Sequence, residues 1–168
     1  MLISDNYRQL NAEMHAAKPQ YGASGGKSAR MVLDLVRRYK AKTVLDYGCG
    51  KGTLRPTIDY AVEVREYDPA VKAKEAAPAM ADLVVCTDVL EHIEMECLDA
   101  VLDDIRRCTG KAAYLAVHLR ESAKHLPDGR NAHILLRPYR WWLERIVARW
   151  ELSVFTRSDN GIGVVVEP

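Results

Sequence analysis

Hydrophobic positions in this chain follow two spacings that alternate along the sequence. Met31, Val32, Leu35 and Val36 recur at three- and four-residue intervals, which is typical of an amphipathic helix. Residues 82–86 are instead almost continuously apolar, as in a strand covered on both faces. The same criteria predict helices over 28–39, 100–108 and 139–150, strands over 43–47, 61–67, 82–86 and 111–118, and a closing hairpin of 152–156 and 162–166.

Strands and helices that alternate in this way are typical of an α/β protein with helices on both faces of a mostly parallel sheet. We therefore predict a Rossmann-like, doubly wound fold with a C-terminal antiparallel hairpin that turns at 159–161. The chain has 168 residues, of which 48% are hydrophobic. This size fits one core, so a single domain over 1–168 is expected.

Composition and charge exclude several other kinds of protein. Polar residues interrupt every hydrophobic segment, so no membrane association is expected, and the N-terminus lacks the pattern of a signal peptide. Cys49, Cys86, Cys97 and Cys108 form no CxxC pair, which indicates reduced thiols and a cytoplasmic location. The net charge of +1 gives no argument for a nucleic-acid partner.

The candidate chemistry begins where the first predicted strand ends. Three glycines at alternate positions, Gly48, Gly50 and Gly52, follow Asp46. Glycine lets the backbone pass close to a ligand because it has no Cβ. A dehydrogenase fingerprint would place its third glycine where Thr53 stands. The observed spacing instead resembles motif I of the class I S-adenosylmethionine-dependent methyltransferases.

Two further motifs extend this resemblance over most of residues 42–118. Residues 66–69, Glu-Tyr-Asp-Pro, close the second strand about where the family places its ribose-binding acid. Residues 82–93 are similar to the "vlEHv" signature of the ubiquinone-biosynthesis-like branch, here in a short stand-alone form. The resemblance implies S-adenosylmethionine as cofactor, S-adenosylhomocysteine as product, and methyl transfer to an oxygen or nitrogen of a small-molecule acceptor.

The resemblance also implies which residues hold the cofactor. Asp46 and the glycine loop would bind the methionine part, and Asp68 the ribose hydroxyls, with Glu66 as the fallback. Glu91 is assigned to the start of a helix, where its charge suits the helix dipole. The cofactor-binding residues expected from the resemblance are Tyr21, Lys27, Asp46, Tyr47, Gly48, Cys49, Gly50, Gly52, Asp68, Pro69, Thr87, Asp88, Val89 and His92.

One part of the chain departs from the family pattern. Residues 69–81 leave room for a turn and a short helical piece, but not for a helix, a third strand and the return. The family commonly has a strand there whose end contacts the adenine. We therefore predict a sheet that lacks one edge strand.

The N-terminal segment, residues 1–40, is expected to cover the cofactor, as in many related enzymes. Residues 22–28 are rich in glycine and serine, but a phosphate loop would need a glycine where Tyr21 stands. The segment is therefore interpreted as a flexible lead into the first helix, with Ser24 or Ser28 as its cap. Tyr21 and Lys27 would then close the site near the methionine carboxylate.

The acceptor is expected to bind beside an insertion and helix over 119–150. His133, near Asn131, is the candidate base or orienting group, because imidazole titrates near neutrality. The alternative is that the polar residues of 118–133 belong to a solvated loop. His118, His125 and His133 share no familiar ligand spacing, so no metal is expected.

Other functions stay open at this point. The protein could be a non-catalytic cofactor-binding module that acts through a partner, and a nicotinamide-dependent reductase is disfavoured by Thr53. A nucleic-acid acceptor would use the arginines of 130–149 and their aromatic neighbours, although these equally suit an amphipathic helix. The three tryptophans are assigned to packing. The sequence does not determine the oligomeric state.

Overall fold

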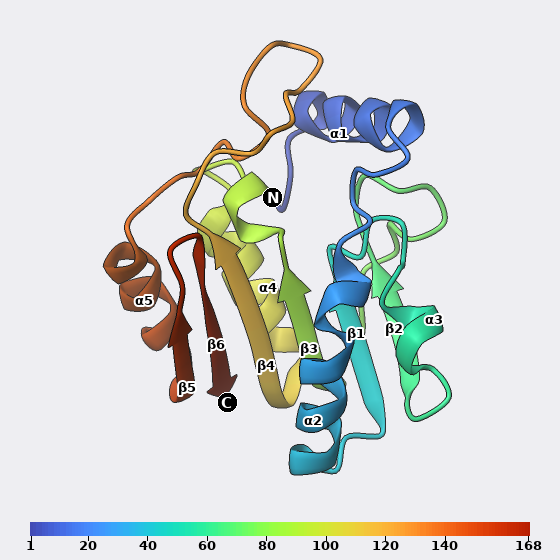
Figure 1. The fold of residues 1–168 in the computed structure, drawn as a ribbon, viewed down its shortest axis with the longest axis vertical. Helices are drawn as coiled ribbons and strands as arrows, with labels where there is room; N and C mark the ends of the chain where they lie inside the picture. The colour runs from blue at the N-terminus through green and yellow to red at the C-terminus, as the bar shows by residue number, and fades with distance from the viewer.

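The computed structural model describes residues 1–168 and contains one six-stranded sheet with the order β2-β1-β3-β4-β6-β5 (Figure 1). Strands β1 to β4 are parallel, and β6 pairs antiparallel with both β4 and β5. The predicted mostly parallel sheet with a C-terminal antiparallel hairpin is confirmed. The strands are β1 Thr43–Tyr47, β2 Glu63–Tyr67, β3 Ala81–Thr87, β4 Thr109–His118, β5 Glu151–Arg157 and β6 Gly161–Glu167.

Helices cover both faces of the sheet, as the doubly wound prediction requires. Helices α2 and α3 pack on one face, and α4 and α5 pack on the other (Figure 1). The first helix, α1, lies above the carboxyl ends of the strands. The helices are α1 Asp5–Ala17, α2 Ala29–Tyr39, α3 Arg55–Ile58, α4 Leu98–Cys108 and α5 Tyr139–Val147, with 3₁₀ turns η1 Gly25–Ser28 and η2 Leu90–His92.

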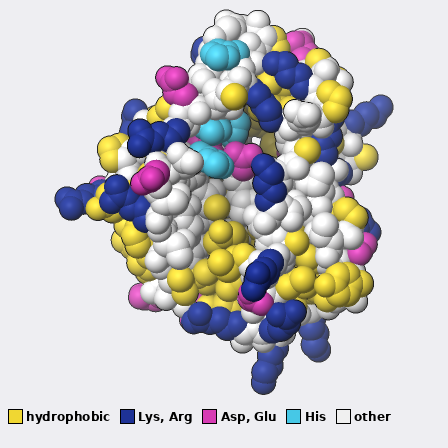
Figure 2. Space-filling view, in the orientation of Figure 1, with side chains coloured by type: hydrophobic (Ala, Val, Ile, Leu, Met, Phe, Trp, Pro, Cys, Tyr) yellow, Lys and Arg dark blue, Asp and Glu magenta, His cyan; other side chains and the backbone are white.

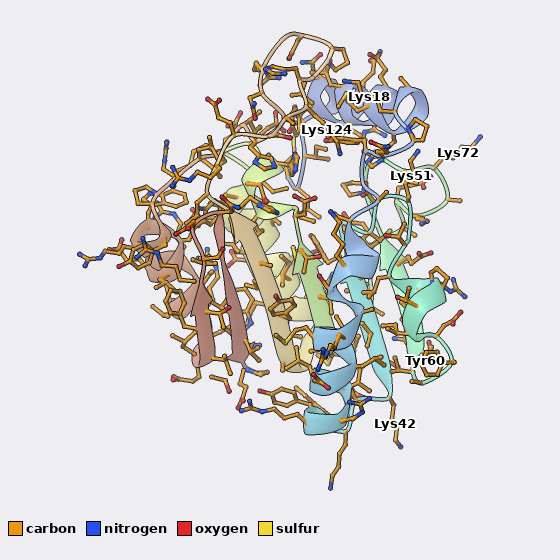
Figure 3. All side chains as sticks on the ribbon, viewed as in Figure 1. Lys18, Lys42, Lys51, Tyr60, Lys72 and Lys124 are labelled. Carbon is orange, nitrogen blue, oxygen red and sulfur yellow. The ribbon has the colours of Figure 1, made fainter.

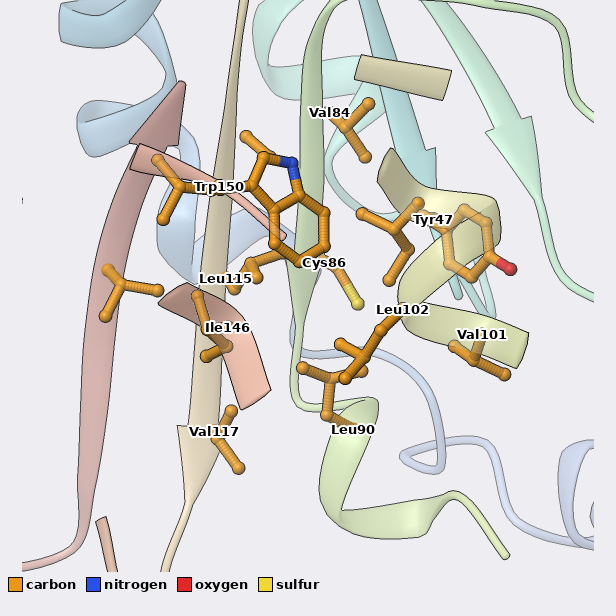
Figure 4. Close-up of a cluster of buried hydrophobic side chains, with 14 of the residues drawn as sticks. Tyr47, Val84, Cys86, Leu90, Val101, Leu102, Leu115, Val117, Ile146 and Trp150 are labelled. Atoms are coloured by element: carbon orange, nitrogen blue, oxygen red, sulfur yellow. The ribbon is translucent and has the colours of Figure 1, made fainter. Parts of the chain in front are cut away.

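Two hydrophobic cores hold these layers together. The larger contains 22 buried residues between the sheet and helices α4 and α5, and the smaller contains 12 beneath α2 and α3. Trp142 and Trp150 are buried in the larger core, which confirms their packing role (Figure 4). All four cysteines are free and buried. None of the helices has the length and hydropathy needed to cross a membrane.

The sheet ends at β2, so the predicted absence of an edge strand is confirmed. Between β2 and β3 the chain forms turns and an extended segment instead. Two arginines, one from β2 and one from α4, bind this segment. Arg65 donates to the carbonyl of Met80 at 3.1 Å, and Arg107 of α4 donates to that of Pro78 at 3.0 Å. The segment between β2 and β3 is thus held by side-chain hydrogen bonds and not by pairing with a strand.

A structure that we call the cap, residues 1–24 and 119–138, covers the carboxyl ends of the parallel strands. Its two halves share a small core of five buried residues, which includes Tyr7 and Leu126. Two lysines join the halves (Figure 3): Lys18 donates to the carbonyl of His125 at 3.3 Å, and Lys124 donates to that of Gln20 at 2.9 Å. Segments more than 100 residues apart therefore close one end of the sheet.

Helix α4 ends at Cys108, as predicted, but β4 begins before the predicted start at residue 111. Thr109 and Gly110 belong to the strand. The Thr109 hydroxyl donates to the carbonyl of Ile105 at 2.7 Å and closes the last turn. A Cβ at Gly110 would lie 2.8 Å from the carbonyl oxygen of Ala81. Glycine at this position therefore lets β3 lie close to β4.

Two adjacent residues of α5 allow a matched test of the larger core. Ile146 is fully buried, whereas Val147 is 49% exposed. We expect Ile146→Ala to lower the free energy of unfolding by about 2–5 kcal/mol, because it leaves a cavity in the core. Val147→Ala should change it by less than about 0.5 kcal/mol. Urea unfolding of both variants measures the difference, and equal losses would contradict the placement of α5.

Candidate active site

A pocket lies between the cap and the carboxyl ends of β1, β2 and β3, which is the edge where open parallel sheets bind ligands. Figure 2 shows histidine and acidic side chains gathered where the surface is hollowed below the cap. Nine of the residues expected from the sequence line this pocket: Tyr21, Gly48, Gly50, Asp68, Pro69, Asp88, Val89, His92 and His133.

The glycine loop needs glycine at each alternate position. Gly48, Gly50 and Gly52 have φ angles of +77°, +51° and +72°, in the left-handed region that other residues rarely adopt. A Cβ on Gly48 would lie 2.5 Å from Val89, and one on Gly50 would lie 2.5 Å from the carbonyl oxygen of Gly22. The missing side chains thus make room for neighbouring segments of the protein at the pocket wall.

The amides of the glycine loop bind the chain itself. Gly48 and Cys49 donate to the carbonyl of Tyr67 at 2.8 and 3.0 Å, and Lys51 donates to that of Gly22 at 2.8 Å. The loop then enters α3, which has only four residues. The helix after the loop is thus a single turn, and the loop connects β1, β2 and the cap.

Asp68 follows β2 at the wall of the pocket and is 7% exposed. Its Oδ2 accepts a hydrogen bond from the amide of Gly50 at 2.9 Å, and its Oδ1 accepts one from Ala70 at 2.9 Å. Each carboxylate oxygen keeps a second lone pair for a ligand hydroxyl. The fallback, Glu66, does not line the pocket; it lies 3.3 Å from the ammonium group of Lys74.

Asp46 lies under the glycine loop rather than in the pocket wall. It is 3% exposed, it pairs in register with Glu66 of β2, and its Oδ2 has no hydrogen-bond partner. Burial, with a smaller effect of the Glu66 charge, raises the pKa of Asp46 to about 7. The carboxyl is therefore largely protonated in the free protein at slightly acidic pH.

Several other expected residues do not line the pocket. Tyr47 points into the larger core, where its hydroxyl donates to Asp104 at 2.9 Å. Gly52 and Cys49 are buried within the loop, and Lys27 is exposed on η1. These residues shape or border the loop and do not contact the space inside the pocket. The expected residues outside the lining are Lys27, Asp46, Tyr47, Cys49, Gly52, Thr87 and Asn131.

Asp88 is the centre of a cluster of polar side chains after β3. Its backbone has a φ of +61°, which is rare for a residue other than glycine and is found more often for aspartate than for most others. The Ser24 hydroxyl donates to Asp88 Oδ2 at 2.7 Å; of the two serines expected to cap α2, Ser28 holds the N-cap position, without a capping hydrogen bond from its side chain. The Nε2 atoms of His92, His118 and His133 lie 4.0, 3.6 and 3.8 Å from Asp88 Oδ1.

The pKa of Asp88 is set by two opposing effects. Burial alone would raise it, but the neighbouring imidazole of His92, the Ser24 hydroxyl and the charge of His118 outweigh burial and lower the pKa to about 2. Asp88 is therefore ionised throughout the neutral range, and it presents a negative charge to the pocket.

His133 reaches this cluster from the cap. Its Nδ1 lies 2.6 Å from the carbonyl oxygen of Arg120, which fixes the tautomer with the proton on Nδ1 and leaves the Nε2 lone pair free. Burial lowers the pKa of His133, so the ring is neutral at physiological pH. Asn131 accepts from the amides of Ser122 and His133 at 3.0 and 2.9 Å. Asn131 therefore orders the loop that positions His133.

Glu91 lies in the first turn of the short η2, in agreement with its assignment to a helix start, but it also has a role that the sequence did not indicate. It is fully buried, and its Oε1 accepts a hydrogen bond from the amide of His118 at 2.9 Å. Its Oε2 has no partner. Burial raises the pKa of Glu91 to about 7. The side chain ties η2 to the end of β4 beneath the pocket.

The sequence did not reveal the contribution of α1. Tyr7, Asn11 and His15 line the pocket from one face of this helix, and Ser122 and Lys124 line it from the other half of the cap. The Tyr21 hydroxyl donates to Asn11 Oδ1 at 2.7 Å. The four-residue spacing of 7, 11 and 15 was the available signal, but these polar residues resemble those of any solvated helix.

The arginines considered for nucleic-acid binding lie elsewhere. The guanidinium groups of Arg137 and Arg145 stack on the ring of Trp141, with distances of 5.6 and 3.5 Å to its centroid. Arg149 forms ion pairs with Asp99 and Asp103 of α4. None of these arginines lines the pocket. They serve the packing of α5 and its surface.

A glycine loop after β1, an acid after β2 and a polar loop after β3, all at one pocket, define a class I methyltransferase. A family model described as a methyltransferase domain matches residues 26–159, and the chain belongs to this family. No curated protein matches the sequence.

Solved structures of methyltransferases share the fold. The 1,6-didemethyltoxoflavin-N1-methyltransferase of Burkholderia thailandensis, with bound 1,6-didemethyltoxoflavin and S-adenosylhomocysteine, has a TM-score of 0.69 at 14% identity, covering 95% of this chain and 86% of that chain. The magnesium protoporphyrin IX methyltransferase of Synechocystis PCC 6803, with bound S-adenosylhomocysteine, has a TM-score of 0.62 at 13% identity, covering 84% and 81%. The family confirms the predicted enzyme class, and the ligands of these neighbours agree with S-adenosylmethionine as cofactor.

The buried carboxyl of Asp46 gives the free protein a defined pH dependence. Its pKa is about 7 in the folded chain against an ordinary value of 3.8, so between these values the folded state holds a proton that the unfolded chain has released. The free energy of unfolding therefore falls as the pH rises through this window. Asp46→Asn removes this pH dependence. The free energy of unfolding of the variant, relative to that of the wild type, should rise by roughly 3 kcal/mol from about pH 5 to about pH 8.

Denaturant unfolding of both proteins at several pH values measures this difference. Other titrating groups are common to both chains and cancel in the comparison. Parallel stability curves would show that Asp46 is ionised in the folded protein.

Proposed function

We propose that this protein transfers the methyl group of S-adenosylmethionine to an oxygen or nitrogen of a small-molecule acceptor. The observation that carries the proposal is the shared pocket: Gly48, Gly50 and Asp68, expected to hold the donor, line the same space as His133, expected to serve the acceptor. The "vlEHv" stretch supports assignment to the ubiquinone-biosynthesis-like branch.

The lining suggests how the donor lies. The methionine part would rest on Gly48 and Gly50, and the ribose hydroxyls would bind the free lone pairs of Asp68. Ile3, Pro69, Ala70 and Ile93 are among the apolar residues of the lining. Such residues suit the adenine and would replace the contact that the absent edge strand provides in the family.

The acceptor would bind beside Asp88, Ser122, Lys124 and His133. These side chains are polar; Ser122, Lys124 and His133 come from the cap and Asp88 from the sheet below it, so the acceptor would be a molecule that fits between the two. The toxoflavin precursor and the magnesium porphyrin of the two similar enzymes are small molecules as well. The arginines of α5 do not line the pocket, so they give no support to a nucleic-acid acceptor.

Methyl transfer requires alignment more than activation, because the sulfonium donor already carries a good leaving group. The acceptor atom attacks the methyl carbon, a new carbon–oxygen or carbon–nitrogen bond forms, and the carbon–sulfur bond breaks to give S-adenosylhomocysteine. An acceptor hydroxyl or protonated nitrogen must also lose a proton. His133 is neutral, has a free Nε2 lone pair and can accept that proton or orient the acceptor.

Asp68→Asn tests the donor site. We expect S-adenosylhomocysteine to bind roughly 10- to 150-fold more weakly, because about 1.5–3 kcal/mol of hydrogen bonding to a charged acceptor is lost. Calorimetric titration measures the affinity. Glu66→Gln is the matched control, since Glu66 closes the same strand but lies outside the pocket. An unchanged affinity of Asp68→Asn, or a larger loss of affinity in Glu66→Gln, would contradict the assignment of Asp68 as the ribose-binding residue.

His133→Ala tests the acceptor side. We expect the rate of transfer from labelled S-adenosylmethionine to a panel of phenols, carboxylic acids and amines to fall by about 10²- to 10⁴-fold, the usual effect of a general base. Donor affinity should stay within a few-fold of the wild type. His125→Ala, an exposed histidine of the same loop, should leave the rate unchanged. Equal rates for all three proteins would remove His133 from the mechanism.

A further inference from the structure

Four side chains that can bind a metal converge at the floor of the pocket. Asp88, Glu91 and His92 come from the turn that follows β3, and His133 comes from the cap. One ligand atom of each lies within 4.8 Å of the others. The spacing of histidines along the sequence does not show this group, because its members belong to two segments about 40 residues apart.

The distances within the group suit a shared ion better than direct contacts. The Nε2 atoms of His92 and His133 lie 4.0 and 3.8 Å from Asp88 Oδ1, which is too far for a hydrogen bond. Two ligands bound to one ion at about 2.1 Å lie about 3.4 Å apart in a tetrahedron and up to about 4.2 Å apart when opposite each other. The group therefore has nearly the size of a coordination shell.

Glu91 provides an independent observation. Its side chain is fully buried, yet Oε2 has no hydrogen-bond partner. A buried carboxylate oxygen without a partner is costly, and neither Glu91 nor Asp88 forms an ion pair with a lysine or arginine. A cation held by both carboxylates would remove this cost.

The protein also holds the atoms that face away from the group. His133 Nδ1 lies 2.6 Å from the carbonyl of Arg120, Asp88 Oδ2 accepts from Ser24 at 2.7 Å, and Glu91 Oε1 accepts from the amide of His118 at 2.9 Å. Metal ligands are commonly oriented in this way, with the second polar atom of each fixed by a neighbour. Three of the four side chains thus leave one atom free toward a common point.

We propose that Asp88, Glu91, His92 and His133 bind a divalent metal ion at the acceptor side of the pocket. Two nitrogen and two oxygen ligands suit Zn²⁺ or Mn²⁺ better than Ca²⁺, which takes oxygen ligands. With an ion at this place, the acceptor is a molecule whose hydroxyl group can coordinate to the ion. This reading of the acceptor rests on the proposed methyltransferase function, whereas the metal site itself does not.

Such an ion would change how the acceptor loses its proton. Coordination lowers the pKa of a bound hydroxyl, whose proton passes to solvent. The resulting oxygen anion forms a bond to the methyl carbon as the carbon–sulfur bond of the donor breaks, giving a methyl ether and S-adenosylhomocysteine. His133 then uses its free Nε2 to hold the ion, which is the orienting role of the two that the proposed function gives it.

The test uses the full-length protein after removal of metals with a chelator. Calorimetric titration with Zn²⁺ and, separately, with Mn²⁺ should give one bound ion per chain for the wild type. Glu91→Gln and His133→Ala should each lower the affinity at least tenfold, in line with the losses seen when metal sites are altered. His125→Ala removes an exposed histidine outside the group and should bind as the wild type does.

Two further measurements distinguish loss of metal binding from loss of folding. Far-ultraviolet circular dichroism shows whether each variant is folded, and the electron paramagnetic resonance of bound Mn²⁺ reports its coordination directly. Failure to bind either ion, or equal binding by wild type, Glu91→Gln and His133→Ala, would overturn the metal site. S-adenosylhomocysteine binding in the presence of chelator tests the donor site separately, so loss of one proposal is distinguished from loss of the other.

Discussion

The site depends on the left-handed turn that follows β1. Because Gly50 has no Cβ, the carbonyl of Gly22 can lie against it, and the amide of Gly50 is free to donate to Asp68. One residue therefore connects the first strand, the cap and the acid that follows the second strand. Any other residue at this position would meet backbone atoms at 2.5 Å, with no flexible group to move aside.

The sheet is trimmed on one side but keeps both of its cores. Helices on each face bury β1, β3 and β4, so these central strands are covered on both sides although the sheet ends at β2. Glu91 connects η2 to the last parallel strand through the amide of His118. The pocket floor is thus built on the best-packed part of the molecule, and its walls come from less regular segments.

Most of the fold could be predicted from the sequence because it rests on local patterns. Apolar runs mark β1, β3 and β4, and the short interval after Asp68 shows that an edge strand is absent. The glycine loop and Asp68 were found from a motif. A covering N-terminal segment was expected, but its packing against residues 119–138 could not be predicted, because these two segments meet only through tertiary contacts. The proximity of His92 and His133 could not be predicted for the same reason. The burial of Glu91 also depends on tertiary contacts, which no local sequence pattern indicates.

The cap is also the part of the protein with the smallest core. Five buried residues join its halves, against 22 and 12 in the cores of the sheet, so the cap has the least buried apolar surface to lose on separation. A unit of this kind opens locally at a free energy well below that of global unfolding. Separation of the cap from the strand ends would then expose the pocket while the two larger cores stay intact.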